Sequence, residues 1–544
     1  MVLDREALDC HYKRADIILA IVIAIIILAL TTFSLYQSCT WGDDFAAYIN
    51  EGIAIAQGRL EEQAELNYFM HPSSMPEEAD GSLVYVWGYP LMLAVIYLIF
   101  GYDTVDFSSI IYYKIPSVIC FALFAAVLYL FFRRRFKTLP SVFLSLAFCS
   151  GQLFYDLINS VYNDVVYMFF CTLCLLLIEQ YFAHKEIKKR LIPGIVLGVV
   201  LWYTYELRLN GVTLLLVFAL CHVVTMVKEK SFSKSDILIH LIPYILFFGL
   251  RFVSEQLILM PATSNASDFD NIDLHTTAAN ALYYITGLID TIRGGISGII
   301  YFFIPESVLP NMSQKAYDLI YTTSQIASCI FFGMAAVGIV TYGIKKNLQL
   351  SFYAVGSAIG TCLLPYNQGL RYLYGIMPVI MLFSGYGCKY AVNIISKYLI
   401  KKEAHGKYKF AVCAVITAVM SIAVISPIIR NDIENCVLLE ASGDDIHANM
   451  TGAYSPNAIE IYRYVQDNTA PDDIICFYKP RALYLNTGRV SYSHIDGDRS
   501  PLEANYCILT EFFYDYYTNT EKPEWFDSFE VVLRNPEMTV MRKK

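Results

Sequence analysis

The chain has 544 residues, of which 56% are hydrophobic, 15% aromatic and only 16% charged, and its mean hydropathy is +0.46. A soluble globular protein carries about a quarter of charged residues, so the composition excludes a soluble or disordered chain and indicates a membrane protein. The net charge of −9 also argues against a nucleic-acid partner, because phosphate binding needs a basic surface.

The first apolar run, 17–35, follows His11, Lys13 and Arg14. Basic residues tend to stay on the cytoplasmic side, so we expect a signal anchor with its N-terminus inside. No small-residue cleavage site follows this run, and we expect it to be retained. Later runs of suitable length bring the prediction to about eleven transmembrane helices. These later runs lie at about 111–132, 138–155, 163–183, 191–206, 210–227, 236–259, 317–343, 350–366, 371–397 and 409–429.

The short loops between the runs alternate in charge, and every basic loop falls on the same side as the N-terminus. The basic loops are 133–137, 185–190, 228–234, 345–346 and 401–409. An odd number of spans then predicts an integral protein of the cell membrane, with a cytoplasmic N-terminus and an extracytoplasmic C-terminus. Counting the apolar segment 84–100 as a span would reverse this order. We expect it to form a helix that lies along or dips into the outer leaflet, and it carries the Gly88-Tyr89-Pro90 break expected of a non-standard entry.

Three segments are expected outside the membrane, and all three are acidic. Segment 36–88 has nine acidic residues and one basic residue, 260–317 has five and two, and 430–544 has nineteen and eleven. The sequence therefore predicts a membrane domain over 1–429, with outer loops at 36–88 and 260–317. From Asn457 a helix-like stretch, a turn and short β-rich runs replace the long apolar runs. Residues 430–544 are thus expected to form a small α/β extracytoplasmic domain.

Two adjacent carboxylates, Asp43 and Asp44, follow the first span and precede a helical stretch. An aspartate before a helix can cap its free N–H groups, which is the structural alternative to a catalytic role. That alternative does not explain why two carboxylates are present.

Asp156 and Asp164 lie near the outer membrane boundary, where ionisable residues are costly and point to function. The alternative for either residue is a solvated loop or a helix cap. Asp164 is the stronger candidate, because it opens the following span beside Asn163.

Arg208 and Arg371 are also expected at the outer boundary. A guanidinium group stays charged and offers fork-shaped donors that match a phosphate. Arg208 has an interfacial role as its alternative. Arg371 and the following Tyr372 open an aromatic-rich helix start, RYLYG, on the side where arginine is disfavoured. We expect both arginines and Tyr372 to bind substrate.

Other signals are weak or missing from the sequence. His71 has no second ligand at zinc-site spacing, so we expect an ordinary loop histidine. The sequence has no P-loop, GxSxG, HExxH or helix-opening GxGxxG motif. Any energy for a reaction is therefore expected to come from an activated substrate in the membrane.

Four blocks of the sequence resemble the GT-C superfamily of polytopic glycosyltransferases. The likeness is to the branch with protein O-mannosyltransferases and the aminoarabinose transferase of lipid A. The blocks are GDDFAAYINEGIAIAQG, VWGYPLMLAVIYLIFG, RYLYGIMP and RYVQDNTAPDDIICFYKPRALYLNTGR. Each motif is weak alone, but their order and their placement on the outer side make the match more specific.

This resemblance implies a membrane domain of about eleven to thirteen spans, with catalytic acid in the first outer loop. Asp43 matches the first acid of the family's Asp-Glu pair, which acts as general base or positions the acceptor. Asp44 takes the second place, where glutamate is commoner. Asp164 resembles the second-loop acid, and Arg371 the arginine that grips the donor phosphate. The surroundings of Arg208 and Asp156 match nothing distinctive.

The expected function is transfer of a sugar from a polyprenyl-phosphate donor to an acceptor hydroxyl on the outer face, with inversion. The acceptor is expected to be a lipid, a polysaccharide or a protein. The three aspartates offer oxygen ligands for Mg²⁺ or Mn²⁺, but the branch resembled favours a metal-independent reaction. The alternatives are a lipid-linked saccharide polymerase or ligase, which shares this topology, and a flippase. A flippase predicts inverted repeats and interrupted helices, which the sequence does not show.

Overall fold

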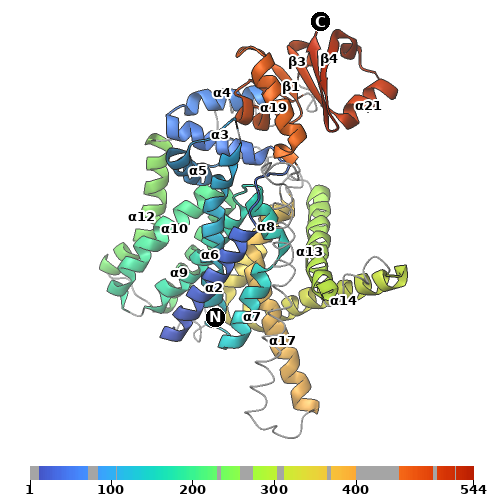
Figure 1. Cartoon of the computed structure of the whole chain (residues 1–544). Helices are drawn as coiled ribbons and strands as arrows, with labels where there is room; N and C mark the ends of the chain where they lie inside the picture. The colour runs from blue at the N-terminus through green and yellow to red at the C-terminus, as the bar shows by residue number, and fades with distance from the viewer. Residues whose placement is uncertain are drawn as a thin grey trace.

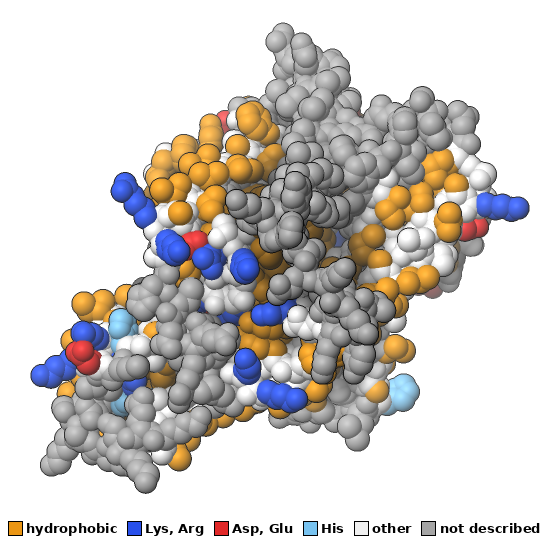
Figure 2. Space-filling view, turned by 90° about the horizontal axis from the view of Figure 1, so that it is seen from below, with side chains coloured by type: hydrophobic (Ala, Val, Ile, Leu, Met, Phe, Trp, Pro, Cys, Tyr) orange, Lys and Arg blue, Asp and Glu red, His pale blue; other side chains and the backbone are white. Residues whose placement is uncertain are grey.

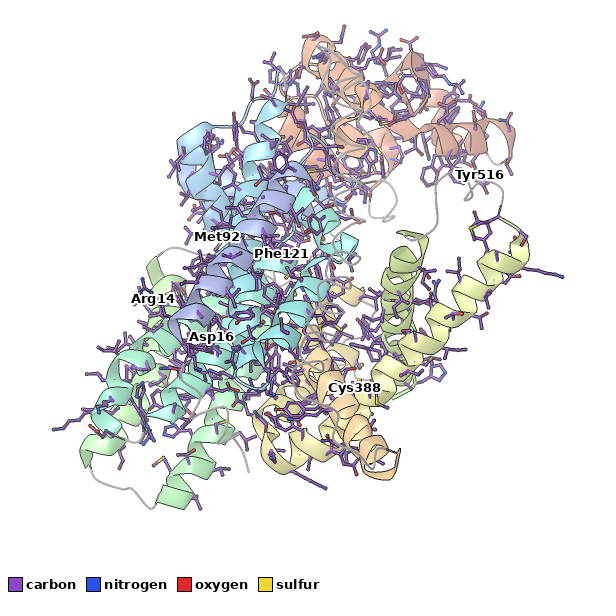
Figure 3. The ribbon with its side chains drawn as sticks, turned by 60° about the horizontal axis from the view of Figure 1, so that its bottom comes forward. Arg14, Asp16, Met92, Phe121, Cys388 and Tyr516 are labelled. Atoms are coloured by element: carbon purple, nitrogen blue, oxygen red, sulfur yellow. The ribbon has the colours of Figure 1, made fainter. Side chains whose placement is uncertain are left out.

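The protein consists of a helical body with a small sheet domain at one end, next to helices α3 and α4 (Figure 1). A computed structural model describes residues 12–71, 84–105, 107–184, 186–229, 234–257, 274–302, 312–363, 369–399, 452–493, 499–520 and 522–544. The N-terminal end of α2 lies at the opposite end of the body from the sheet domain. Side chains fill the spaces between the helices, and the fully buried ring of Phe121 lies near the centre of the body (Figure 3).

The helical body begins with α2 and two short helices, α3 and α4, that belong to the first expected outer segment. Its elements as far as α12 are α2 (Arg14–Phe33), α3 (Asp44–Gln57), α4 (Leu60–Met70), α5 (Gly88–Phe100), η3 (Ser108–Lys114), α6 (Ile115–Arg133), α7 (Thr138–Cys149), α8 (Gln152–Asn159), α9 (Asp164–Ala183), η4 (Ile187–Arg190), α10 (Leu191–Leu207), η5 (Leu209–Gly211), α11 (Val212–Glu229) and α12 (Lys234–Leu257). The elements that follow are α13 (Leu274–Phe302), α14 (Gln314–Gly338), the π-helical turn η8 (Ile339–Gly343), α15 (Ile344–Lys346), α16 (Leu348–Cys362), η9 (Leu370–Ile376) and α17 (Met377–Leu399).

Seven helices in the described part of the chain are long and apolar enough to cross a membrane. Each corresponds to one of the predicted runs. They are Arg14–Phe33, Ser108–Arg133, Asp164–Ala183, Lys188–Leu207, Leu209–Val227, Ile237–Gln256 and Gln314–Lys346. A polytopic helical protein is therefore confirmed, whereas the count of eleven is not.

The remaining predicted spans differ from single long helices. The run at 138–155 is broken, because α7 and α8 meet at an angle of 51°. The run at 350–366 forms α16, which has only 15 residues, and the run at 371–397 opens with the 3₁₀ turn η9. The run at 409–429 and the start of the expected outer domain, 430–451, lie outside the described residues.

Two expected outer segments contain helices. In the segment 84–100, α5 starts at Gly88, as the Gly88-Tyr89-Pro90 break predicts, and runs for 13 residues against α3. Within the expected outer loop 260–317, residues Leu274–Phe302 form the 29-residue helix α13, which packs against α14 and α16. Its apolar residues are interleaved with glycine, threonine and charged residues, and this is why hydropathy does not identify it as a span.

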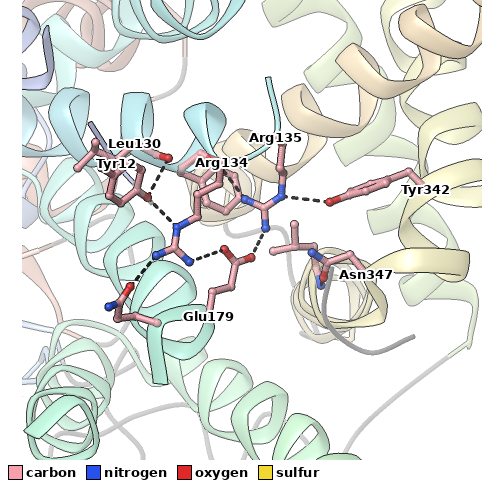
Figure 4. A network of polar contacts seen from close by, with 10 residues as sticks. Tyr12, Leu130, Arg134, Arg135, Glu179, Tyr342 and Asn347 are labelled. Carbon is pink, nitrogen blue, oxygen red and sulfur yellow. Dashed lines mark hydrogen bonds and ion pairs between the residues drawn. The ribbon is translucent and has the colours of Figure 1, made fainter. Parts of the chain in front are cut away.

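Arginines of the predicted basic loop 133–137 form a polar network at the end of the body where α2 begins. Arg134 donates hydrogen bonds to the Tyr12 hydroxyl at 2.7 Å and to Glu179 at 3.3 Å (Figure 4). Arg135 pairs with the same Glu179 and donates to the Tyr342 hydroxyl at 3.3 Å. Seen from this end, Lys and Arg side chains outnumber acidic ones (Figure 2). Glu179 of α9 thus pairs with both arginines that follow α6, and Arg135 connects this pair to η8.

Helices α14 and α17 approach each other so closely that glycine is required at their crossing. A Cβ atom added to Gly338 would lie 1.9 Å from the carbonyl oxygen of Phe383, and one added to Gly387 would lie 1.9 Å from that of Met334. Backbone atoms cannot rotate away, so the helices themselves would have to separate.

We therefore expect Gly338→Ala to destabilise the protein by about 1–3 kcal/mol through overpacking. The matched control is Gly333→Ala in the same helix, where an added Cβ meets nothing within 4 Å. Because alanine favours helix over glycine, this control should be neutral or stabilising by up to about 1 kcal/mol. Thermal unfolding of both variants in detergent is the measurement, and equal midpoints would contradict this account of the crossing.

The C-terminal domain is a small α/β unit, as the sequence predicts. Its strands are β1 (Ile475–Phe477), β2 (Ser491–Tyr492), β3 (Tyr506–Thr510), β4 (Phe529–Arg534) and β5 (Met538–Lys543), and its helical elements are η10 (Gly452–Tyr454), α19 (Pro456–Asn468), α20 (Pro480–Thr487), η11 (Pro501–Glu503), α21 (Glu511–Asn519) and η12 (Glu524–Ser528). The strand order is β2-β1-β3-β5-β4, with the first three strands parallel and β5 antiparallel to both neighbours.

Residues alternate between the two faces of this sheet. Ile475, Phe477 and Ile508 belong to the same buried cluster as the helical body, whereas Cys476 and its register partner Cys507 pack on the other face. One face of the sheet is therefore continuous with the core of the helical body.

Candidate functional site

Charged side chains from four separate elements meet where helices of the body end. Asp44 is the first residue of α3, and Asp164 is the first residue of α9. Arg208 follows the last residue of α10, and Arg371 lies in η9 just before α17. The boundary positions inferred from the sequence therefore correspond to helix ends.

Asp44 and Arg371 form one ion pair. Nη2 of Arg371 donates to Oδ2 of Asp44 at 2.6 Å, and about a quarter of each side chain is exposed. The Tyr85 hydroxyl also hydrogen-bonds this carboxylate. Burial by itself would raise the pKa of Asp44, but the charge of Arg371 and the bond from Tyr85 outweigh it and hold that pKa below its usual value. Asp44 is therefore ionised and forms an ion pair with Arg371.

Asp164 and Arg208 form a second, more buried pair. Nη2 of Arg208 donates to Oδ1 of Asp164 at 2.6 Å, and the side chains are 10% and 1% exposed. Nε of Arg208 donates to Asn163 at 3.1 Å. Within the described residues, Nη1 of Arg208 and Oδ2 of Asp164 have no hydrogen-bond partner. A buried donor without a partner is costly, so this pair offers a guanidinium N–H to a ligand.

Aromatic rings connect the two pairs. The centroid of the Tyr372 ring lies 4.5 Å from the Arg208 guanidinium and 5.9 Å from that of Arg371, so both cations lie near the same aromatic ring. Tyr48 of α3 is 3% exposed and stacks on Tyr85 with ring centroids 4.2 Å apart.

Tyr48 lies among all four charges. Burial raises the pKa of its hydroxyl well above the usual value, and this pKa also responds to the charges of Arg208, Asp44, Arg371 and Asp164. The predicted residues Asp44, Asp164, Arg208, Arg371 and Tyr372 are thus brought together around Tyr48, which the sequence analysis did not single out.

The Asp43 side chain contacts different residues from those that Asp44 contacts. Its side chain makes no capping hydrogen bond to its own helix. Instead, Oδ1 accepts from the backbone N–H of Ala482 in α20 at 3.2 Å, and Oδ2 lies 3.1 Å from Nε2 of His71. The helix-cap interpretation is therefore wrong for α3, because the carboxylate lies at the start of a helix in the C-terminal domain. His71 is likewise more than a loop histidine, since it ends α4 against Asp43.

Two further expectations concern Asp156 and the three aspartates that could bind a metal ion. Asp156 is exposed on α8, and its charge acts on Tyr36. Asp43, Asp44 and Asp164 each have a separate partner, so they do not share one oxygen cluster of the kind that Mg²⁺ prefers. Over the described ranges, no group of three or more His, Cys, Asp or Glu side chains is arranged to hold a metal ion.

Glu51, on α3, is a buried carboxyl that the sequence analysis did not identify. It is 0% exposed and accepts from the backbone N–H of Val84 at 2.7 Å and from Asn67 at 3.3 Å. Burial raises its pKa to about 7, although these hydrogen bonds act in the opposite direction. Glu51 lies in an amphipathic stretch, where a glutamate is unremarkable, so no sequence signal distinguishes it.

Glu51→Gln is expected to stabilise the protein at pH 8 and to have little effect near pH 4.5. The unfolded carboxyl loses its proton around pH 4.5 and the folded one only around pH 7, so wild-type stability falls between these values. The linkage amounts to at most about 3 kcal/mol. Unfolding midpoints at pH 5 and pH 8 measure it, with the exposed Glu65→Gln as the matched control. A Glu51→Gln effect that is equal at both pH values would refute the assignment.

Comparison with solved structures identifies the fold. No protein-family model matches the sequence, and no curated protein does either. ArnT from Cupriavidus metallidurans, solved bound to undecaprenyl phosphate, superposes with a TM-score of 0.50 at 12% identity, covering 96% of this chain and 97% of that chain. Its apo structure has the same TM-score and coverage at 11% identity. The oligosaccharyltransferase AglB from Archaeoglobus fulgidus, in complex with an inhibitory peptide and a dolichol-phosphate, has a TM-score of 0.47 at 11% identity, covering 92% and 70%.

The similarity to ArnT extends over nearly the whole of both chains. The chain therefore shares the fold of ArnT.

Proposed function

We propose that the protein is an integral membrane glycosyltransferase that moves a sugar from a polyprenyl-phosphate donor to an acceptor hydroxyl. The observation that carries this proposal is the pair of arginine–carboxylate contacts, Asp44–Arg371 and Asp164–Arg208, gathered around Tyr48 and Tyr372. Two guanidinium groups at helix ends provide the charge that a lipid-borne phosphate needs. The undecaprenyl phosphate bound to ArnT supports the same class of donor for this fold.

Arg371 is the proposed ligand of the departing phosphate. It is the more exposed of the two arginines, and its partner Asp44 leaves part of the guanidinium open. Negative charge grows on the phosphate oxygen as the bond to the sugar breaks, so Arg371 binds the transition state more tightly than the ground state. Arg208 offers its free Nη1 to the same phosphate from the buried side.

Asp43 is the proposed general base. The acceptor oxygen bonds to the anomeric carbon while its proton passes to the Asp43 carboxylate. The bond from that carbon to the phosphate oxygen breaks, and its electron pair stays on the polyprenyl phosphate. One displacement of this kind inverts the anomeric configuration. The contacts from Ala482 and His71 hold Asp43 in one orientation, as a positioned base requires.

The proposed orientation follows from charge. The basic network of Arg134 and Arg135 lies at the N-terminal end of the body, which the positive-inside preference assigns to the cytoplasm. The C-terminal domain and α3 lie at the other end (Figure 1). The reaction is therefore proposed to take place at the outer face of the cell membrane, on a lipid, polysaccharide or protein acceptor.

A donor panel tests this function directly. Membranes that contain the protein are incubated with radiolabelled polyprenyl-phosphate sugars that differ in the sugar, and loss of each donor is measured. We expect one donor to be consumed by the wild type and not by Asp43→Asn. If no donor is consumed beyond the level of membranes without the protein, the proposed function is wrong.

A further inference from the structure

The C-terminal domain meets the proposed base through the first turn of α20. The Ala482 N–H donates to Asp43, and the Asn50 side chain of α3 donates to the carbonyl of Arg481 at 3.2 Å. Trp41, two residues before Asp43, packs on Phe477 and Tyr478 with ring centroids 5.9 and 5.7 Å apart. The start of α20 is thus fixed against the segment that carries Asp43.

Arg481 is a buried cation in this contact with unsatisfied donors. Its side chain is 7% exposed. Within the parts of the chain that the structure describes, its Nε and Nη2 atoms have no hydrogen-bond partner. Oδ2 of Asp43 lies 3.9 Å from Nε, which is an ion-pair distance but too long for a hydrogen bond. Leaving buried guanidinium donors unpaired is costly, so the Nε and Nη2 atoms of Arg481 are expected to donate hydrogen bonds to an oxygen atom of a ligand.

The surroundings of Arg481 indicate which kind of oxygen fits. Nε and Nη2 lie on one edge of the guanidinium plane, so a single oxygen can accept from both. The same oxygen would also approach the Asp43 carboxylate, which repels an anion. A hydroxyl group suits both neighbours, because its oxygen accepts hydrogen bonds from Arg481 and its O–H donates to Oδ2 of Asp43.

We propose that Arg481 binds the acceptor hydroxyl, so that the C-terminal domain supplies the acceptor-binding residue of the site. This inference rests on the proposed function, because it takes Asp43 as the base that receives the hydroxyl proton. The positive charge of Arg481 also stabilises the negative charge that develops on the acceptor oxygen during attack.

The two proposed substrate positions lie in separate parts of the protein. The charges of Arg371 and Arg481 both act on Asp44, and Arg371 is its direct ion-pair partner. An inverting displacement needs the acceptor and the leaving phosphate on opposite faces of the anomeric carbon. In this proposal the phosphate is bound by Arg371 of the helical body and the acceptor by Arg481 of the C-terminal domain, so the two substrates approach the anomeric carbon from different parts of the protein.

The test separates acceptor use from donor binding in Arg481→Gln. Membranes with wild-type or variant protein receive the labelled donor identified in the panel, and label transferred to endogenous acceptor is measured. The affinity of the purified protein for undecaprenyl phosphate is measured separately in detergent. We expect transfer to fall about 10- to 100-fold, as for loss of hydrogen bonds to a charged group, with unchanged affinity for undecaprenyl phosphate. Arg463→Gln, an exposed arginine of α19 in the same domain, is the matched control.

Several results would contradict the proposed role of Arg481 or the proposed function. Unchanged transfer in Arg481→Gln, or a parallel loss of undecaprenyl phosphate affinity, overturns the inference. If the glutamine variant unfolds, Arg481→Lys keeps the charge and should retain folding with reduced transfer; wild-type transfer in that folded variant also overturns it. If the wild type itself transfers no label, the proposed function fails, which differs from failure of this inference alone.

Discussion

Arg371→Gln is expected to lower the rate of sugar transfer by about 10²- to 10³-fold, the usual effect of removing one preorganised donor from developing negative charge. Glutamine keeps part of the length of the side chain but removes the charge that faces the phosphate. Asp44 is 24% exposed, so water can solvate its carboxylate after the change, and the fold should survive. Turnover of the labelled donor and the affinity for undecaprenyl phosphate are the two measurements.

Arg293→Gln is the matched control for this result. Arg293 also pairs with an aspartate, Asp290 at 3.2 Å, and lies 4.4 Å from an aromatic ring, that of Tyr321, but it belongs to α13. We expect normal transfer in this variant. Wild-type turnover in Arg371→Gln would show that the phosphate is held elsewhere.

Arg208 is a poorer choice for the same experiment. Its partner Asp164 is 1% exposed, so Arg208→Gln would leave a buried carboxylate without a counter-ion. Breaking a buried pair in this way costs about 3–5 kcal/mol. A loss of activity in Arg208→Gln would therefore combine a weaker fold with weaker phosphate binding, whereas Arg371→Gln separates them.

The membrane spans could be predicted from the sequence where helices are apolar on all sides. A helix that faces lipid needs a long apolar run, and such runs identified the seven helices that are long and apolar enough to cross a membrane. Helix α13 was not predicted, because its apolar residues are interleaved with glycine, threonine and charged residues. Ser328 of α14 donates a hydrogen bond to the Ile289 carbonyl of this helix at 2.7 Å. The break between α7 and α8 was missed because both halves are apolar.

The site could be predicted only as a set of candidates. Charged residues at the edge of apolar runs are conspicuous, which identified Asp44, Asp164, Arg208 and Arg371. Their pairing could not be predicted, because Asp44 and Arg371 are 327 residues apart and nothing local connects them. Arg481 stayed hidden for another reason: it lies in a polar domain, where an arginine is common, and only its burial distinguishes it.

Asp43→Asn is expected to reduce transfer by about 10²- to 10⁴-fold, the contribution of a positioned general base. The amide is as large as the carboxylate, and its oxygen can still accept from the Ala482 N–H, so the contact with α20 should remain. It cannot take up the acceptor proton. The measurements are transfer in membranes, undecaprenyl phosphate affinity, and the unfolding midpoint, which reports any loosening of the domain contact.

Asp44→Asn and Asp156→Asn complete this comparison. Asp156 is exposed on α8, so its variant should transfer sugar normally. Asp44→Asn removes the counter-ion of Arg371, so the positive charge of this arginine is no longer compensated by a carboxylate. Undecaprenyl phosphate should therefore bind Arg371 more tightly. We therefore expect different results for the two adjacent carboxylates. Asp43→Asn changes turnover at constant affinity for undecaprenyl phosphate, and Asp44→Asn changes that affinity. If Asp43→Asn is fully active and Asp44→Asn is inactive at unchanged lipid affinity, the base is the carboxylate beside Arg371, and the acceptor approaches from that side.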